Sequence, residues 1–256
     1  MDFFKHKNRA YGYPKHKLLI LVFFLSIFQG VSYAQIPKPA HVVIVILENR
    51  AYNQIIGSSA APFINSLVKS KDGALFTNFH AITHPSQPNY LALFSGSVQG
   101  IKNDGKPKNL PFTTPNLGNE LLEKGYTFAG YSEDLPGVGF AGVSSGLYVR
   151  KHNPWVNWQD SKKNGLPDRV NLPLTRFPKN YKFLPVVSFV IPNLDNDMHN
   201  GSIKRGDKWI REHLKGYIEW AKKHNSLFIL TFDEDNGTSI NKIPTLLVGE
   251  MVKQGK

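Results

Sequence analysis

The sequence of 256 residues predicts an α/β fold with a mainly parallel central sheet flanked by helices. Continuous runs of β-branched and other apolar residues recur along the chain, as in strands that are buried on both faces. Segments with apolar residues at helical spacing lie between these runs, and strands that alternate with helices favour parallel pairing. No repeat or low-complexity segment interrupts the pattern, so we expect one domain.

The predicted elements follow one another from residue 41 to residue 248. The strands are expected at 41–47 (HVVIVIL), 126–131, 186–191 (VVSFVI), 227–232 (LFILTF) and 244–248. The helices are expected at 62–70, 117–124 and 207–224. In the last of these, apolar residues recur at helical spacing from Trp209 to Ala221, and Asp207 is the candidate N-cap.

Two long segments, 96–115 and 137–185, are rich in Gly, Pro, Asn and Lys. We interpret both as surface excursions of the one domain rather than as linkers. Long loops of this kind are often functional.

The first 34 residues have the three parts of a secretory signal peptide. A stretch with five Lys or Arg and one Asp precedes an apolar run at 18–28, LLILVFFLSIF, and small residues follow at Ser32 and Ala34. Cleavage there would leave Gln35 as the first mature residue. The alternative is a membrane anchor, but the apolar run is shorter than the roughly 20 residues that span a bilayer. We therefore expect a secreted or periplasmic protein without a stable membrane anchor after cleavage.

The composition excludes several classes of site and partner. The chain has no cysteine, which rules out disulfides, zinc–thiolate sites, Cys nucleophiles and a lipid anchor on a mature N-terminal Cys. Its formal charge is +12, of which residues 1–34 contribute +4 and residues 35–256 contribute +8. A basic surface suits phosphate esters or acidic lipid head groups. The Lys and Arg are scattered, with no RNA-binding signature, so we expect no nucleic acid partner.

Polar clusters follow three of the predicted buried strands. Glu48-Asn49 comes after the first, the sequence PNLDNDMHNG at 192–201 after the second, and Asp233-Glu234 after the third. In open α/β sheets, ligands gather at the carboxyl ends of the strands. Neighbouring carboxylates repel one another unless a cation or a proton lies between them. A single such residue is usually a loop residue or a helix cap, but three clusters together predict a divalent metal site.

A fourth cluster is the sequence HPSQPNY at 84–90, which leads into the apolar stretch LALFSG. A Ser just before a helix start places its hydroxyl beside free backbone N–H groups, which suits an attacking oxygen and a bound phosphate. Taken alone, Ser86 is more simply a helix cap. The acidic clusters make it a candidate nucleophile.

Six motifs in this order resemble a known family. They are ILEN at 46–49, HPSQPNYLALFSG at 84–96, KHNP at 151–154, PNLDNDMHNG at 192–201, GDKW at 206–209 and TFDEDNG at 231–237. Together they resemble the bacterial phosphoesterase family of acid phosphatases and phospholipases C, within the alkaline phosphatase superfamily. The resemblance runs from about His41 to the C-terminus. It implies an alkaline-phosphatase-like sandwich with a mainly parallel sheet.

The resemblance also implies roles for individual residues, which we carry over by motif. The implied metal-binding residues are Glu48, Asn49, Ser86, Asp233 and Glu234. The implied nucleophile is Ser86, supported by two further candidate catalytic residues, His152 and His199. The candidate substrate-binding residues are His152, Asp197 and Asn89. Asp195 is a rival of Asp197, because superfamily relatives often place the Asp four residues before the His.

The implied mechanism is metal-assisted attack of Ser86 on phosphorus, giving a phosphoserine that water hydrolyses. His152 or His199 would stabilise equatorial charge or protonate the leaving oxygen. Oxygen ligands suit Ca²⁺, Mg²⁺ or Mn²⁺ better than zinc, although superfamily relatives also use zinc. Family members usually continue past the strand at 244–248 with a further segment that has a His, so a second metal is left open here.

The leading hypothesis is an exported acid phosphatase that hydrolyses phosphomonoesters, including phosphoinositide head groups. The alternative is a phospholipase C or phosphodiesterase that acts on phospholipids. A third interpretation, from another class, is a truncated inactive protein that binds anionic lipid through its basic surface.

Overall fold

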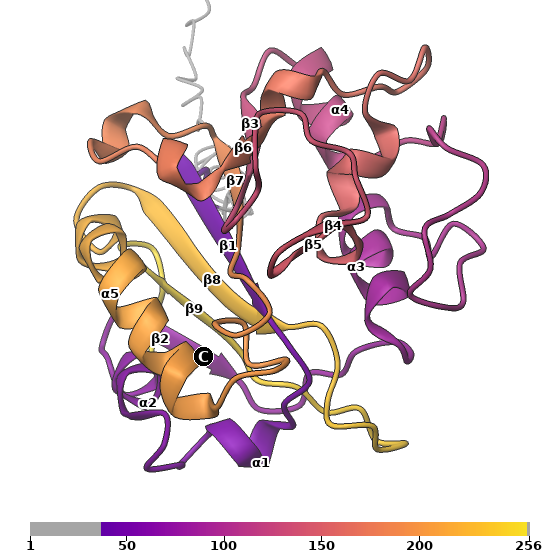
Figure 1. Cartoon of the computed structure of the whole chain (residues 1–256). Helices are drawn as coiled ribbons and strands as arrows, with labels where there is room; N and C mark the ends of the chain where they lie inside the picture. Colours follow the sequence, from indigo (N-terminus) through magenta and orange to yellow (C-terminus); the bar gives the residue numbers. More distant parts are fainter. Residues whose placement is uncertain (1–36, 255–256) are drawn as a thin grey trace, which may run out of the picture. The chain divides into compact units, whose positions relative to one another are not determined.

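A computed structural model describes residues 37–254 of the chain (Figure 1). The chain divides into two units, Met1–Pro37 and Lys38–Lys256, and the fold described below is that of the second unit. The predicted signal peptide lies outside the described residues. Between residues 37 and 254, no helix combines the length and the apolar character needed to cross a membrane.

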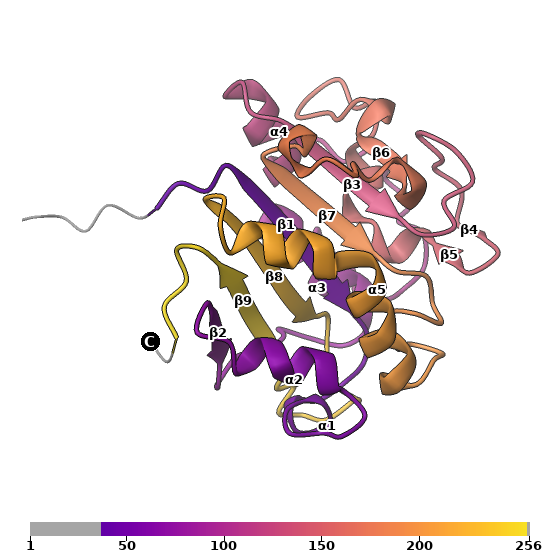
Figure 2. The same cartoon turned by 90° about the vertical axis from the view of Figure 1, so that its left-hand side faces the viewer.

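The core of the fold is a seven-stranded sheet with the order β2-β9-β8-β1-β7-β3-β6. The strands are β1 (His41–Leu47), β2 (Gly73–Phe76), β3 (Phe128–Ser132), β6 (Asn171–Pro173), β7 (Val187–Ile191), β8 (Ser226–Phe232) and β9 (Thr245–Gly249). From β8 to β6, every neighbouring pair is parallel. The mainly parallel sheet is therefore confirmed, with β1 at its centre between β8 and β7 (Figure 2).

The two antiparallel strands lie together at one edge. The predicted strand at 244–248 is β9, which pairs antiparallel with β8, and β2 pairs antiparallel with β9. Neither β2 nor β6 was predicted. Both lie at the sheet edges and have only four and three residues, which is too short for an apolar pattern to indicate a strand.

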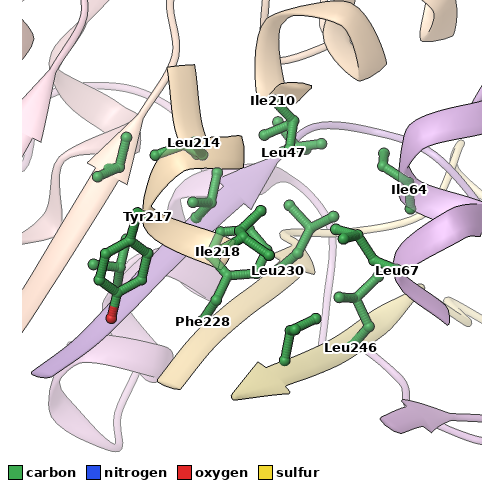
Figure 3. Close-up of a cluster of buried hydrophobic side chains, with 14 of the residues drawn as sticks. Leu47, Ile64, Leu67, Ile210, Leu214, Tyr217, Ile218, Phe228, Leu230 and Leu246 are labelled. Carbon is green, nitrogen blue, oxygen red and sulfur yellow. The ribbon is translucent and has the colours of Figure 1, made fainter. Parts of the chain in front are cut away.

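Two helices, α2 (Pro62–Val68) and α5 (Ile203–Ala221), cover one face of the sheet (Figure 2). Their apolar sides pack on inward residues of the central strands, as Figure 3 shows for Leu214 and Ile218 of α5 against Phe228 and Leu230 of β8. The short helix α1 (Tyr52–Ile55) precedes α2. The predicted helix at 207–224 begins earlier, because Ser202 is its N-cap and accepts a hydrogen bond from the Arg205 N–H at 3.2 Å. The prediction that Asp207 caps this helix was therefore wrong.

The opposite face holds α3 (Ser86–Ser95), α4 (Leu117–Glu123) and a set of 3₁₀ turns. An aromatic cluster fills the space beneath them, including Phe94 of α3 and Phe189 of β7. Trp155 and Trp158, from the turn η2 (Pro154–Trp158), are 1% and 0% exposed and belong to this cluster. The expectation that 137–185 is a surface excursion was wrong for this part, since Trp155 and Trp158 are core residues of this cluster.

The same long segment contains a short hairpin and the remaining turns. The hairpin strands are β4 (Ser144–Ser145) and β5 (Tyr148–Val149), and the turn η1 (Arg150–His152) follows at once. Further 3₁₀ turns are η3 (Asp168–Val170), η4 (Leu174–Arg176) and η5 (Tyr181–Phe183). The turn η1 places the KHNP motif beside the carboxyl end of β1, where the candidate site lies.

Candidate active site

The register of two central strands brings the first acidic clusters together. Leu47, the last residue of β1, pairs with Phe232, the last residue of β8. Because these strands are parallel, the residues that follow them, Glu48-Asn49 and Asp233-Glu234, emerge side by side. The backbone N–H of Asn49 donates to Oδ1 of Asp233 at 3.1 Å. Asn49 has a positive φ of 54°, a conformation that Asn tolerates better than most residues.

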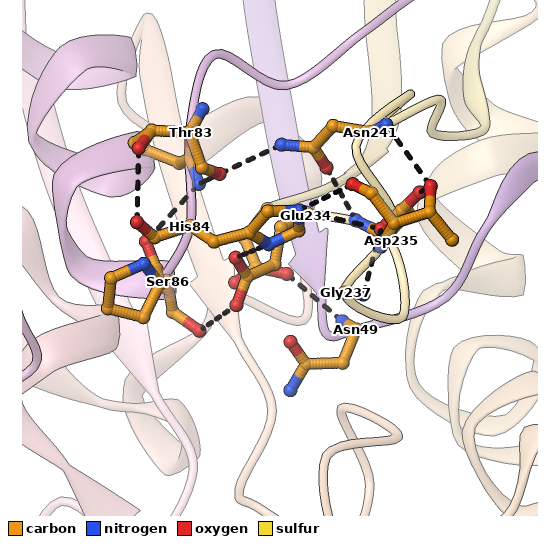
Figure 4. Close-up of polar contacts among 12 residues, drawn as sticks. Asn49, Thr83, His84, Ser86, Glu234, Asp235, Gly237 and Asn241 are labelled. Carbon is orange, nitrogen blue, oxygen red and sulfur yellow. Dashed lines mark hydrogen bonds and ion pairs between the residues drawn. The ribbon is translucent and has the colours of Figure 1, made fainter.

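Ser86 lies between these two clusters. It is the first residue of α3, 2% exposed, and its Oγ donates to Oε1 of Glu234 at 3.0 Å and to Oε2 of Glu48 at 3.2 Å. Figure 4 shows Ser86 at the start of α3 facing Glu234, with Asn49 on the opposite side of the site. The structure therefore brings together the hydroxyl and the carboxylates that the sequence predicts to be neighbours.

His152 and Asp197 complete the buried part of the site. Nε2 of His152 is 3.1 Å from Oε1 of Glu48, and Nδ1 is 3.3 Å from Oδ2 of Asp197. Neither ring nitrogen is aligned for a hydrogen bond within the described part of the chain. The loop that contains Asp197 is bound to the end of β1, since the backbone carbonyl of Asp197 accepts a hydrogen bond from the Glu48 N–H at 2.8 Å. Burial holds the pKa of His152 well below its usual range, so the ring is neutral and able to act as a ligand.

The carboxylates of the site are in an unfavourable environment when no cation is bound. Burial, with the charges of Asp233 and Asp197, raises the pKa of Glu48 well above its usual value. Burial and the charge of Glu234 raise the pKa of Asp233 to about 7. Oδ2 of Asp233 and Oδ2 of Asp197 are buried without a hydrogen-bond partner among the described residues. Such orphaned oxygens in a cluster of like charge fit a cation.

Two overlapping sets of side chains could hold a divalent metal ion, and both include Glu48. One is Glu48, His152 and Asp197, which each offer a ligand atom within 4.8 Å of the others. The second is the predicted set of Glu48, Asn49, Ser86, Asp233 and Glu234. His152 as a ligand was not predicted, because its motif implied contact with the substrate. The set with the His152 nitrogen suits Zn²⁺ or Mn²⁺ better than Mg²⁺ or Ca²⁺, whereas the set of oxygen ligands suits Mg²⁺, Ca²⁺ or Mn²⁺.

Two predicted residues lie outside the cluster of carboxylates. Oδ1 of Asn89 accepts hydrogen bonds from the N–H groups of Ile82 and Thr83, both at 3.2 Å, so this side chain holds the loop before Ser86. His199 is half-buried on the turn that follows Asp197, with its ring 6.1 Å from that of His152. Their roles in substrate binding and proton transfer stay predictions.

The structure decides which acidic residue after β7 faces the site. Asp197 is fully buried against His152, whereas Asp195 pairs with Arg205 at 2.9 Å on the outside of the loop. Asp197 is thus the one that lies in the cluster.

Sequence reasoning missed two residues of the site. The hydroxyl of Tyr90 donates to Oε1 of Glu48 at 2.5 Å, and its ring stacks on His152 with centroids 5.1 Å apart. Nδ1 of His84 is 2.5 Å from Oε2 of Glu234. Both belong to the HPSQPNY motif that contains Ser86. The available signal was the helical spacing of Ser86 and Tyr90, four residues apart and hence on one face of α3.

Comparisons with known proteins agree with this geometry. The model of the "Phosphoesterase family" matches residues 58–255. A phosphatidylinositol-3-phosphatase of Mycobacterium tuberculosis is 51% identical over 228 residues, covering 88% of this chain and 74% of the relative. An acid phosphatase of Aspergillus fumigatus is 36% identical over 216 residues, covering 80% of this chain and 47% of the relative. The chain thus spans about half the length of this fungal relative.

Solved structures support the fold. A protein of the alkaline phosphatase superfamily from Vibrio parahaemolyticus has a TM-score of 0.54 at 14% identity and covers 85% of this chain and 62% of its own. A lipoteichoic acid synthase from Listeria monocytogenes has a TM-score of 0.56 at 10% identity, over 86% of this chain and 68% of its own. At these identities the likeness concerns the fold alone, which confirms the expected alkaline-phosphatase-like architecture.

Proposed function

Because the chain belongs to the phosphoesterase family, and is by that membership a phosphoric ester hydrolase, we propose that it is a metal-dependent phosphomonoesterase with Ser86 as its nucleophile. The observation that supports this most directly is the position of the Ser86 hydroxyl, buried between Glu48 and Glu234 at the ends of two neighbouring strands. A Ser whose only role was to cap α3 would turn its oxygen toward the N–H groups of that helix.

The reaction that this geometry supports has two displacements. Ser86 Oγ attacks phosphorus, its proton passes to Glu234 at 3.0 Å, and the alcohol leaves as a phosphoserine forms. Water then attacks the phosphoserine and releases inorganic phosphate, while Ser86 recovers its proton. We assign protonation of the leaving oxygen to His199, which is half-buried and whose ring is 6.1 Å from that of His152.

A divalent cation held by the residues named above would neutralise phosphate oxygens and stabilise the ionised Ser86 hydroxyl. Neighbouring residues of the chain hold the side chains that would bind this cation in place. Tyr90 fixes one oxygen of Glu48, the Asn49 N–H fixes Asp233, and His84 fixes Glu234. These contacts fasten each ligand at the geometry seen here.

The relatives and the charge of the chain support a proposal for the substrate class. The relatives include a phosphatidylinositol-3-phosphatase and fungal acid phosphatases, and residues 35–256 have a formal charge of +8. We therefore assign phosphomonoesters as substrates, with phosphoinositide head groups among them. The basic leader and apolar run at the N-terminus support export, so the substrate would be met outside the cytoplasm.

The test is hydrolysis of p-nitrophenyl phosphate by the parent and by Ser86→Ala, each with and without chelator. We expect the substitution to lower kcat by at least about 10³-fold, because the nucleophile is lost. Ser95→Ala is the matched control, since Ser95 lies at the far end of the same helix and bonds only to local groups. A phosphoserine trapped at acid pH in the parent, and absent in Ser86→Ala, would identify the intermediate.

The same assay separates the alternatives. A strong preference for bis-p-nitrophenyl phosphate or phosphatidylcholine over the monoester would favour the phosphodiesterase or phospholipase C reaction. Liposome binding that survives Ser86→Ala, with no turnover in the parent, would favour the inactive lipid-binding protein. Full activity in Ser86→Ala would contradict the mechanism.

A further inference from the structure

A lysine lies beside the buried acidic cluster. Lys151 directly precedes His152 in η1, its side chain is 19% exposed, and its Nζ is 2.6 Å from Oδ2 of Asp104. Burial is the largest influence on the pKa of Glu48 and of Asp197 and raises both, whereas the positive charge of Lys151 lowers both. The ammonium is therefore close enough to act on the site electrostatically.

Asp104 connects this lysine to the start of α3. Its second oxygen, Oδ1, accepts a hydrogen bond from the backbone N–H of Gln87, the residue after Ser86, at 3.0 Å. One carboxylate thus bridges the helix that presents the candidate nucleophile and the turn that presents Lys151. Asp104 lies in the segment 96–115, which the sequence predicts to be a surface excursion.

The Asp104 turn is itself held by a buried side chain. Gln87 is 1% exposed, and its Nε2 donates to the carbonyl oxygens of Asn103 and Gly105, both at 2.8 Å. Gln87, the residue that follows Ser86, therefore holds Asp104 through three hydrogen bonds. Its side-chain amide binds the backbone carbonyls on either side of Asp104, and its backbone N–H binds the Asp104 carboxylate.

The start of α3 has little to offer a phosphate from its backbone. Pro88 has no N–H, and the N–H of Gln87 is already bound to Asp104. The expectation that free N–H groups at this helix start bind a phosphate therefore fails for Gln87 and Pro88. Lys151 is a cation near the same helix start, because Asp104 contacts both its Nζ and the Gln87 N–H.

We propose that Lys151 binds the non-bridging phosphate oxygens of the substrate at Ser86, that Asp104 and Gln87 are its positioning residues, and that this cation makes the site select monoesters over diesters. The inference rests on the proposed function, since it concerns the same site. A phosphate monoester has a charge of about −1.5 to −2 near neutral pH, as in phosphoserine, whereas a diester has a single charge. A partly buried ammonium discriminates between them because its interaction scales with that charge.

The experiment measures kcat/KM for p-nitrophenyl phosphate and bis-p-nitrophenyl phosphate in Lys151→Met. We expect the monoester value to fall about 30-fold and the diester value about threefold, so that their ratio falls about tenfold. The inhibition constant of inorganic phosphate should rise by a similar factor of about 30. Lys151→Arg, which keeps the charge, should retain the parent ratio to within about threefold.

The matched control is Lys208→Met, on the exposed side of α5, where the side chain is 63% exposed. This variant loses the same charge from the protein and should leave both substrates unaffected. If Lys151→Met has a lowered Tm, the ratio of monoester to diester kcat/KM is measured in Lys151→Gln instead, which keeps a polar side chain at this position. Equal losses on the two substrates in these variants, or an unchanged inhibition by phosphate, would overturn the proposal.

Asp104→Asn tests the positioning contact. We expect KM for the monoester to rise about fivefold with kcat within about twofold, because the ammonium is no longer held by a charge. Tighter binding of monoester or phosphate would instead show that the carboxylate competes with substrate, and it would overturn the positioning role. Activity that survives Ser86→Ala would contradict the proposed function separately, whatever Lys151→Met does.

Discussion

Asp207, in the second turn of α5, caps a different helix: its Oδ1 accepts a hydrogen bond from the backbone N–H of Ile64 in α2 at 2.8 Å. Its Oδ2 accepts from the N–H of Phe63 at 3.1 Å. The residue before α2 is Ala61, which has no side chain that could cap it. A negative charge at the N-terminus of α2 is favourable, and here it comes from a helix 143 residues away in the chain.

Asp207→Ala should lower the free energy of unfolding by about 2 kcal/mol, because two N–H groups of α2, one of them buried, lose their acceptors. Asp207→Asn should have a smaller effect, since one acceptor oxygen is retained. Urea denaturation followed by circular dichroism measures both. Glu212→Ala, on the exposed side of the same helix, is the control and should change stability by less than about 0.5 kcal/mol. A loss in Asp207→Ala no greater than that of the control would show that the cap contributes nothing.

Gly130→Ala should be strongly destabilising. Gly130 lies in β3 beneath the aromatic cluster, and a Cβ at this position would be 2.1 Å from Cε2 of Trp155. A shift of the indole away from this Cβ would break the hydrogen bond that its Nε1 donates to Oδ1 of Asn171 at 2.9 Å. We expect a loss of about 3 kcal/mol in the free energy of unfolding, at the upper end for overpacking. Gly137→Ala, whose Cβ would meet nothing within 4 Å, should be nearly neutral. Similar urea midpoints for the two variants would contradict this account.

The parts of the fold that could be predicted are those that local sequence determines. The strands β1, β7 and β8 are buried on both faces, and their continuous apolar runs are visible in the sequence. Edge strands such as β2 are half-exposed and short, so no pattern distinguishes them from loops. Trp155 was assigned to a surface segment because the sequence around it is rich in Gly and Pro, which predict loops, although Trp155 is buried in the structure.

The residues of the site likewise divide into those that the strand assignments place together and those that only tertiary packing brings together. Glu48 and Asp233 were predicted to meet because parallel strands end at one edge, a rule that needs only the strand assignments. The contact between Asp104 and Lys151 joins two loops 47 residues apart, and no periodicity places them together. His152 as a neighbour of Asp197 likewise depends on tertiary packing, although the KHNP motif had marked it as functional.

Tyr90→Phe should weaken catalysis without unfolding the protein. The Tyr90 hydroxyl donates to Oε1 of Glu48, and this hydrogen bond lowers the pKa of a carboxyl that burial raises. Without it, Glu48 takes up a proton more readily and binds a cation less well. We expect kcat/KM for p-nitrophenyl phosphate to fall about tenfold at pH 5 and less at pH 8, since the neighbours of metal ligands contribute about 10- to 100-fold.

The Phe ring of this variant keeps the stacking on His152, so its Tm should stay close to that of the parent. Tyr126→Phe is the matched control, because Tyr126 bonds to Lys38 on the surface and should not alter activity. A loss in Tyr90→Phe that is the same at both pH values would show that the hydroxyl acts otherwise than through the charge of Glu48.

Divalent cations should stabilise the protein more as the pH rises. The pKa of Asp233 is about 7 in the folded state, above the value of about 4 expected for an unfolded Asp. Between these values the metal-free folded state binds more protons than the unfolded state, so its stability falls with rising pH by up to about 1.4 kcal/mol per unit for this group. A bound cation removes that loss, because it takes the place of the proton. The rise in Tm on replacing EDTA with MgCl₂ or MnCl₂ should therefore be about 2 °C at pH 5 and about 8 °C at pH 7.5. Asp233→Asn, which cannot ionise, should reduce the difference between the two pH values, and a parent protein whose Tm rises equally at both would refute the linkage.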